Sequence, residues 1–304
     1  MDNMTRTCDS QALPGKEDQR YDDLEDVTVD VLSALNVEDY LAHSSPQFRY
    51  IGERTTALRR QFCGREHRST ALESIAVIVA LTRLVKHSDR ILDGALSGMD
   101  CISATPGLWN RMMCEWPMGD YGRTLAEYIN VHRLARGKIL ELGAGVGHAS
   151  KFVHIDSDTV YVKTDLNEVI LQMYNRGGIL EPFDIDSDAI PYQSFNLVFA
   201  SNVLHCAQSK YKTLKNIFRM LGPGGYLVFS EGAPEVQPDR GWCLAPLFGF
   251  LDGWWDRGGF LDLEHWSALA RDAGFSLSAR EPMRYGRSIL GNLIACRKES
   301  PRLD

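Results

Sequence analysis

The sequence lacks the usual marks of a disulfide-stabilised, metal-binding or nucleic-acid-binding protein. Its seven cysteines are an odd number at wide spacing, and no C-x-x-C pattern occurs among them. Neither a disulfide framework nor a zinc site is therefore expected, and we expect no metal. The net charge of −7 argues against a nucleic-acid partner, because a phosphate backbone usually binds a basic surface.

Long hydrophobic runs and an N-terminal leader pattern are also missing. The most apolar helical segment runs from Ile75 to Val85 and includes Thr82 and Arg83. It is far shorter than the roughly 20 residues that span a bilayer. The first residues lack the basic and apolar regions of a signal peptide. We therefore expect a cytoplasmic protein with no membrane partner.

The chain divides by pattern into three parts. Residues 1–20 are polar with mixed charge, which predicts a disordered tail. Residues 21–135 show helical spacing of apolar residues and no convincing alternating strand, which predicts an all-helical lid and substrate region. This region is also a candidate surface for a homodimer. Residues 136–304 are predicted to form the core domain.

Short apolar runs alternate with helical patterns throughout the third part. Strands are predicted over 138–142, 159–163, 196–200, 226–229, 275–280 and 290–296. The clearest helix between them covers residues 211–221 and is stopped by Gly222-Pro223-Gly224-Gly225. Alternation of this kind predicts an α/β fold, a mostly parallel sheet with helices on both faces.

A glycine-rich loop follows the first predicted strand and is expected to open a helix. It reads Gly143-Ala144-Gly145-Val146-Gly147, and Glu141 precedes it. Glycines let backbone amides approach a ligand closely. A dehydrogenase with a nicotinamide cofactor, the alternative here, typically has the spacing G-x-G-x-x-G. A carboxylate tolerates a cationic, phosphate-free ligand better than a pyrophosphate, so Glu141 favours a sulfonium cofactor.

Two aspartates follow the next predicted strands. Asp165 ends the second strand, roughly 20 residues after the loop, where a carboxylate can accept both ribose hydroxyls. Asp184 ends the third strand and is placed to meet an adenine edge. The alternative is a simple glycine turn followed by two aspartates that cap helices.

The segments ILELGAGVGHAS, YVKTDLNEVIL, FDID, FNLVFASNVLHC and LKNIFRMLGPGGYLVFSEG together resemble class I S-adenosylmethionine-dependent methyltransferases. The resemblance implies a Rossmann-like, seven-stranded sheet whose last strand is antiparallel. It also implies that S-adenosyl-L-methionine is the cofactor, with its methionyl part in the glycine loop and its ribose on the second-strand acid. The candidate cofactor-binding residues are Glu141, Gly143, Ala144, Gly145, Gly147, Asp165, Leu166, Asp184, Ile185, Ser201 and Asn202.

Later segments carry a narrower resemblance. NVLHC, LGPGGYLVFSEG, GWW at residues 253–255 and HWSALARDAGFS resemble the C-methyltransferase domains of polyketide synthases, here free-standing. Those domains methylate the acidic carbon between two carbonyls and are thought to use a His–Glu pair. The matching positions are His205 and Glu231. Cys206 stands where those domains have alanine.

The position of His205 and Glu231 supports this pair independently. His205 lies just past the fourth predicted strand and Glu231 just past the fifth, so both belong to the carboxyl edge of the sheet, where ligands bind. An imidazole with an ordinary pKa of about 6.5 accepts a proton at neutral pH, and a carboxylate fixes its tautomer. We predict a general base. The alternative is that His205 caps the next helix and Glu231 caps or pairs with an arginine.

Aromatic residues crowd the connection between residues 242 and 260 and predict a substrate wall, although packing between core and appendage would also explain them. The candidates there are Trp242, Phe250, Trp254 and Trp255, and those for the opposite wall are Trp109, Trp116 and Tyr121. The predicted function is methyl transfer to an activated carbon of a small natural-product intermediate, next to a carbonyl or on a ring such as indole. An O- or N-methyltransferase and a non-catalytic cofactor-binding regulatory protein are the alternatives.

Overall fold

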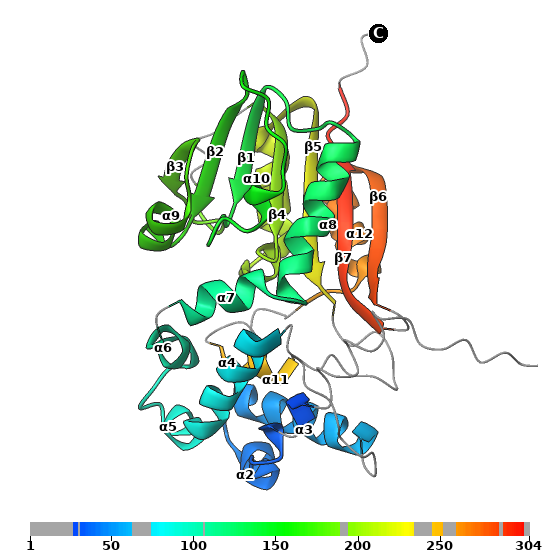
Figure 1. Ribbon diagram of the computed structural model, residues 1–304. Coiled ribbons are helices and arrows are strands. Elements are labelled where there is room, and N and C mark those ends of the chain that lie inside the picture. The colour runs from blue at the N-terminus through cyan, green and yellow to red at the C-terminus, as the bar shows by residue number, and fades with distance from the viewer. Residues whose placement is uncertain are drawn as a thin grey trace, which may run out of the picture.

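A seven-stranded sheet forms the centre of the protein, and a layer of helices lies along one end of it (Figure 1). The computed structural model describes residues 27–29, 31–62, 74–105, 107–188, 194–233, 245–251, 260–285 and 288–300. The strands are β1 Lys138–Leu142, β2 Val160–Asp165, β3 Ile179–Pro182, β4 Phe195–Ser201, β5 Leu221–Gly232, β6 Ser276–Tyr285 and β7 Ser288–Arg297. The predicted strands are therefore all present.

The strands lie in the order β3-β2-β1-β4-β5-β7-β6. Strands β1 to β5 pair in parallel, and β7 runs antiparallel to both β5 and β6. The predicted Rossmann-like sheet with an antiparallel last strand is confirmed. The strand order reverses between β1 and β4, and ligands of open α/β sheets bind at the carboxyl ends of the strands beside such a reversal.

Helices cover both faces of the sheet, as predicted. On one face α8, Met118–Val131, buries Leu125 and Ile129 in a cluster with β1, β4, β5 and β7. On the other face α10, Lys210–Met220, and α12, Leu263–Asp272, bury their apolar sides in a second cluster. The shorter helix α9, Glu168–Tyr174, packs beside β2 and β3.

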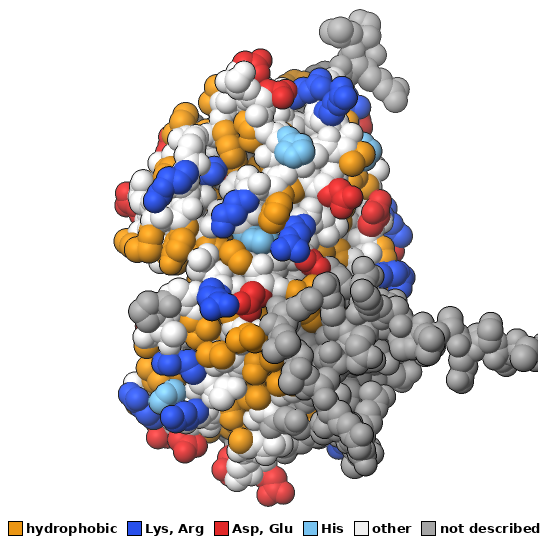
Figure 2. Space-filling model, in the orientation of Figure 1, with side chains coloured by type: hydrophobic (Ala, Val, Ile, Leu, Met, Phe, Trp, Pro, Cys, Tyr) orange, Lys and Arg blue, Asp and Glu red, His pale blue; other side chains and the backbone are white. Residues whose placement is uncertain are grey.

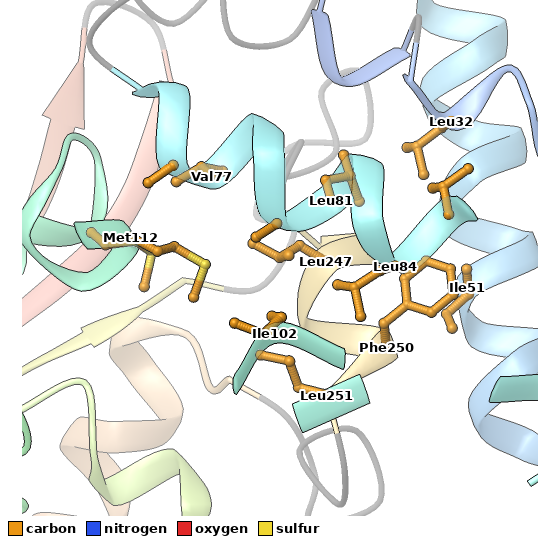
Figure 3. Packing of buried hydrophobic residues seen from close by; sticks show 14 of the residues in the cluster. Leu32, Ile51, Val77, Leu81, Leu84, Ile102, Met112, Leu247, Phe250 and Leu251 are labelled. Atoms are coloured by element: carbon orange, nitrogen blue, oxygen red, sulfur yellow. The ribbon is translucent and has the colours of Figure 1, made fainter. Parts of the chain in front are cut away.

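The helical layer is built from α2 Val37–Ala42, α3 Pro46–Phe62, α4 Ile75–Lys86, α5 Ser88–Leu92, α6 Gly98–Ser103 and α7 Leu108–Cys114. A later helix, α11 Ala245–Phe250, comes from the connection between β5 and α12 and packs among them. Figure 3 shows Leu247 and Phe250 of α11 between Leu81 and Leu84 of α4 and Ile51 of α3. A Cβ on Gly98 would lie only 1.8 Å from the Phe250 carbonyl oxygen, so α6 needs glycine at this contact.

These contacts change the boundary between the helical layer and the core domain. Helix α8 packs on the sheet although it precedes residue 136, and α11 packs in the helical layer although it follows it. We propose that the core domain begins near Met118 and that residues 245–251 belong to the helical layer. The predicted tail, residues 1–20, lies outside the described residues. Among the described helices none is long and apolar enough to cross a membrane.

Candidate active site

The glycine loop leaves β1 in a series of left-handed turns. Gly143, Gly145 and Gly147 have φ values of 61°, 48° and 69°, which other residues rarely adopt. A Cβ on Gly143 would lie 2.4 Å from the side chain of Val203, the second residue after β4, so only glycine fits here. The prediction of a helix directly after the loop was wrong. Only a 3₁₀ turn, Ala149–Lys151, forms there. Gly147, with φ 69°, interrupts any right-handed helix that would begin in the loop.

Glu141 lies at the base of this loop in a buried polar network. The Tyr161 hydroxyl donates to Glu141 Oε2 at 2.5 Å, and the side chain of Glu141 is almost fully buried. Burial raises the pKa of Glu141 to about 7, although Tyr161 and the Lys163 charge act in the opposite direction. Glu141 therefore changes its charge near neutral pH.

Asp165 joins the loop to the end of β2. Its Oδ2 accepts the Gly145 N–H at 2.8 Å and its Oδ1 accepts the Asn167 N–H at 2.8 Å. Burial raises the pKa of Asp165, and the two backbone donors counter that effect. Each carboxylate oxygen keeps a second lone pair for a ligand hydroxyl.

A cavity of about 760 Å³ opens at the carboxyl edge of the sheet, between the sheet and the helical layer. The outline of the molecule narrows between these two parts on the side of α9 (Figure 2). Every predicted cofactor-binding residue lines the cavity except Gly147. Gly147 instead packs against Asn175, where a Cβ would come within 2.8 Å of Asn175 Oδ1. Its role is to turn the chain.

The chemistry of the cavity wall fits a cationic ligand without phosphates. Acidic side chains from the ends of β1, β2 and β3 line it, among them Glu141, Asp165 and Asp184. Among the described lining residues there is neither a lysine nor an arginine. A pyrophosphate would meet carboxylates and no fixed positive side chain here, which disfavours the dehydrogenase alternative.

Asn202 supplies a second mark of a ligand. It takes a left-handed conformation, φ 57°, directly after β4, and its side chain is 7% exposed on the cavity wall. Neither amide atom of this side chain has a hydrogen-bond partner among the described residues. Buried amides are normally paired, so this one fits a group that binds in the cavity.

The helical layer closes the other side of the cavity. Met99 of α6, Trp109 and Met113 of α7 and Met118 of α8 line it. Trp109 was a candidate from sequence, whereas the three methionines had no distinguishing spacing. His148, in the segment after the glycine loop, also lines the cavity. Its Nε2 donates to the Gly119 carbonyl of α8 at 2.7 Å.

Other aromatic candidates have different roles. Phe250 is fully buried in the helical layer, with its ring centroid 6.2 Å from that of Tyr40. It is a packing residue because α11 turns it away from the cavity. Trp116 is buried in the same cluster, and the Tyr121 hydroxyl donates to the Leu290 carbonyl at 2.6 Å. Trp242, Trp254 and Trp255 lie outside the described residues.

The structure brings His205 and Glu231 together at the ends of β4 and β5. His205 Nδ1 lies 2.7 Å from Glu231 Oε2, and both side chains are at most 1% exposed. Glu231 Oε1 accepts the N–H groups of Val203 at 2.9 Å and Leu204 at 2.5 Å. One carboxylate thus caps the 3₁₀ turn Leu204–Cys206 and holds the imidazole. Of the capping alternative, only the part that concerns Glu231 is seen, because the next helix, α10, is capped by the Ser209 side chain and not by His205.

The surroundings of His205 favour its protonated form. Burial lowers the pKa of this imidazole, but the Cys206 sulfur and the Glu231 carboxylate outweigh burial and raise it to about 10. Cys206 Sγ lies 3.2 Å from Nε2, and the Phe260 ring centroid lies 4.4 Å from the imidazole. Cys206 lines the cavity, whereas His205 lies directly beneath it.

A profile of a methyltransferase domain family matches residues 118–288 of the sequence. The chain belongs to this methyltransferase family. The matched segment begins at α8, the first helix that packs on the sheet. The enzyme is a methyltransferase that depends on S-adenosyl-L-methionine, and the predicted cofactor is confirmed.

Curated relatives of this methyltransferase are large synthases. It is 28% identical over 239 residues to "Highly reducing polyketide synthase ALT1" of Alternaria alternata, covering 68% of this chain and 8% of that protein. It is 33% identical over 168 residues to "Fumosorinone synthetase" of Cordyceps fumosorosea, covering 47% of this chain and 4% of that one. The methyltransferase thus spans a small fraction of the length of these relatives.

Solved structures share the whole fold, including the helical layer. "CurJ carbon methyltransferase" matches with a TM-score of 0.71 at 19% identity over 93% of both chains. "Trans-methyltransferase CalH complex with SAH" matches with a TM-score of 0.73 at 19% identity over 94% of this methyltransferase and 93% of that chain. The "citrinin polyketide synthase CMeT domain" matches with a TM-score of 0.69 at 16% identity, over 94% and 96%.

Cofactor affinity of this methyltransferase is expected to depend on pH through Glu141. The bound cofactor is cationic, so it favours the ionised carboxylate, whose fraction rises as pH passes through about 7. The dissociation constant should therefore fall by up to about tenfold between about pH 6 and about pH 8. Calorimetric titration with S-adenosylmethionine measures it. Glu141→Gln should flatten this dependence, and an unchanged dependence in that variant would assign it to another group.

Proposed function

We propose that this methyltransferase acts on an activated carbon of a small-molecule acceptor, with His205 and Glu231 as its general base. The buried His205–Glu231 pair at the carboxyl edge of β4 and β5 carries the proposal. Methyl transfer to carbon or to a phenol needs a group that removes a proton, whereas transfer to a neutral amine does not require one before attack. A dry, oriented imidazole is suited to that task.

Glu231, His205 and the helical layer have separate tasks in the proposed reaction. S-adenosyl-L-methionine supplies an electrophilic methyl group when it is bound. The Nδ1–H group of His205 donates a hydrogen bond to the Glu231 carboxylate, which leaves Nε2 as the atom that accepts a proton. The raised pKa of His205 strengthens it as a base and holds the proton that it takes. The helical layer excludes water from the cavity and aligns the acceptor for an in-line attack.

We also propose how the cofactor is held. Asp165 accepts the ribose hydroxyls, Asp184 and Ile185 meet the adenine, and Leu166 packs beside them. The glycine loop, Ser201 and Asn202 surround the methionyl part, and Glu141 balances its positive charge. The position of these residues around one cavity supports this arrangement.

The acceptor is proposed to be largely apolar. Met99, Trp109, Met113 and Met118 form the wall that the helical layer presents to the cavity. Methionine side chains adapt to irregular apolar ligands, and a tryptophan supplies a flat face. The resemblance to domains of polyketide synthases supports an acceptor with a carbon next to a carbonyl.

The position of the new methyl group tests the proposal. The protein is incubated with methyl-¹³C-labelled S-adenosylmethionine and one of four probes: a β-ketoacyl N-acetylcysteamine thioester, indole, catechol or a primary amine. Carbon methylation of the thioester or indole gives a labelled methyl signal in the aliphatic region. A downfield signal, from a methyl on oxygen or nitrogen, would replace the proposal by an O- or N-methyltransferase. Cofactor binding without any product from a wider acceptor panel would favour the regulatory alternative.

A further inference from the structure

Cys206 extends the His205–Glu231 pair into a chain of three polar groups. Its Sγ lies 3.2 Å from His205 Nε2, and His205 Nδ1 lies 2.7 Å from Glu231 Oε2. Glu231 is fixed in turn by two backbone N–H groups at the start of the 3₁₀ turn. A thiol, an imidazole and a carboxylate in this sequence form the arrangement that activates a cysteine in other enzymes.

The thiol, and not the imidazole, lies on the cavity wall. His205 is 1% exposed and is covered by Cys206 and by the Phe260 ring. Cys206 lines the cavity together with Asn202, whose buried amide has no hydrogen-bond partner among the described residues. A bound acceptor that reaches the base therefore meets sulfur first, next to an amide that is available to hold a carbonyl oxygen.

We propose that Cys206 is a catalytic residue that carries the proton from the acceptor to His205. This inference rests on the proposed function. Neutral His205 first takes the thiol proton at Nε2, which gives a thiolate beside an imidazolium. The thiolate then removes the acidic proton of the acceptor: the C–H bond breaks, an S–H bond forms, and the electron pair moves toward the carbonyl. The carbanion forms a C–C bond to the methyl group of the cofactor while the bond between that methyl and sulfur breaks. The electron pair of the broken bond stays on sulfur, which leaves as the neutral thioether of S-adenosylhomocysteine, and the imidazolium releases its proton to solvent.

The setting of Cys206 differs from that of the other described cysteines. Burial raises the pKa of the thiols of Cys101, Cys114 and Cys296. Among the described residues none of these three thiols has an imidazole as its hydrogen-bond partner: Cys101 lies near the Arg83 carbonyl and Cys114 near the Asn110 side chain. Thiolates form most readily beside a cationic imidazole. Cys206 is the one of these four that has such a partner.

Alkylation tests the coupling between Cys206 and His205 without methyl transfer. The intact protein is treated with iodoacetamide over a range of pH, and the modified peptides are quantified by mass. The other titratable groups on the described wall are Glu141, His148, Asp165, Glu168, Asp184 and Asp186. The five carboxylates disfavour a thiolate by their charge. His148 has a pKa lowered by burial, and its Nε2 is already bonded to the Gly119 carbonyl. His205 is therefore the group placed to accept the proton of the thiol, with its Nε2 3.2 Å from the sulfur.

The expected result is that Cys206 is modified faster than Cys114 at neutral pH, and that S-adenosylhomocysteine protects it. In His205→Gln the modification of Cys206 should slow by about tenfold or more, because the thiol loses the group that accepts its proton. Cys114, which is partly exposed, is the internal reference and should react alike in both proteins. An equal rate of Cys206 modification with and without His205 would overturn the proposal.

Kinetics separates this proposal from the proposed function. Cys206→Ala should lower kcat by about 10²-fold, the lower end for a positioned base, and should change the pH–rate profile. Cys114→Ala is the matched control and should keep the wild-type rate. Full activity and an unchanged pH profile in Cys206→Ala, with His205→Ala inactive, would overturn the role of Cys206 and leave the proposed function standing. A methyl adduct on Cys206 after incubation with the cofactor alone would show a nucleophile instead of a base and would also overturn it.

Discussion

Replacing His205 by alanine is expected to lower kcat by about 10²- to 10⁴-fold, the range that a general base contributes. The imidazole is the only titratable group that bridges Cys206 and Glu231 among the described residues. Its loss removes the acceptor for the proton of the substrate. The dissociation constant for S-adenosylhomocysteine should stay nearly unchanged, because His205 does not line the cavity. Labelled-product kinetics and calorimetry measure the two quantities.

His265→Ala is the matched control for this variant. His265 is a 72% exposed histidine that also lies 2.7 Å from a carboxylate, that of Asp262, but it is on α12. Its replacement should leave kcat unchanged. A kcat of His205→Ala equal to that of the wild type would remove His205 from the mechanism, whether or not the cofactor affinity changes. A fall in both variants would point to a general loss of stability.

The direction in which the wild-type rate changes with pH also tests whether His205 acts as a base. His205 has to be neutral to accept a proton, and its pKa is raised to about 10. The active fraction should therefore grow as pH rises from neutrality toward that value. A rate that falls over this range would contradict a base at His205.

The sheet was predictable from the sequence because its strands are almost entirely buried. Parallel strands covered on both faces read as short apolar runs, and β4 and β5 are such runs between clear turn signals. The division of the chain was less predictable. Nothing in the spacing of α8 distinguishes a helix on the sheet from one in the layer. Helix α11 packs with α3 and α4 only through contacts between residues far apart in the sequence, such as Gln47 and Gly249, which are 202 residues apart.

The cofactor site was predictable to a similar degree and for a related reason. Residues at the carboxyl ends of parallel strands must share one edge, so Glu141, Asp165, Asp184 and Asn202 could be placed together. The cavity residues of the helical layer could not be predicted, because Met99 and Met113 reach the cavity through the packing of α6 and α7. The sequence also put His205 at the edge but could not show that Cys206 lies above it.

Helix α8 connects the helical layer to the cofactor site. His148, in the segment after the glycine loop, holds the Gly119 carbonyl at the start of this helix. Tyr121 of α8 then makes two hydrogen bonds to the sheet. Ser230 Oγ of β5 donates to the Tyr121 carbonyl at 2.9 Å, and the Tyr121 hydroxyl donates to the Leu290 carbonyl of β7. The end of β5 that carries Glu231 is therefore fixed by the same helix that carries Met118 into the cavity.

Replacing Glu231 by glutamine is expected to lower kcat by about 10⁴-fold while the fold is retained. Gln Oε1 can still accept the N–H groups of Val203 and Leu204, which lie 2.9 and 2.5 Å from the carboxylate. Its amide nitrogen, however, donates to Nδ1 of His205 and drives the proton to Nε2. That is the wrong tautomer for a base, and an analogous change in serine proteases has an effect of this size. Steady-state kinetics measures kcat, and urea unfolding measures the stability.

Glu231→Ala separates the capping role of this carboxylate from its catalytic role. Alanine leaves two N–H groups and an imidazole without their acceptor in a site that is 0–1% exposed. Breaking a buried pair in this way should lower the free energy of unfolding by about 3–5 kcal/mol. Glu264→Gln, an exposed carboxylate paired with Arg280, is the control and should change neither quantity. If the Ala variant unfolds like the Gln variant, Glu231 does not hold the turn that carries His205, and its effect on kcat acts through the tautomer alone.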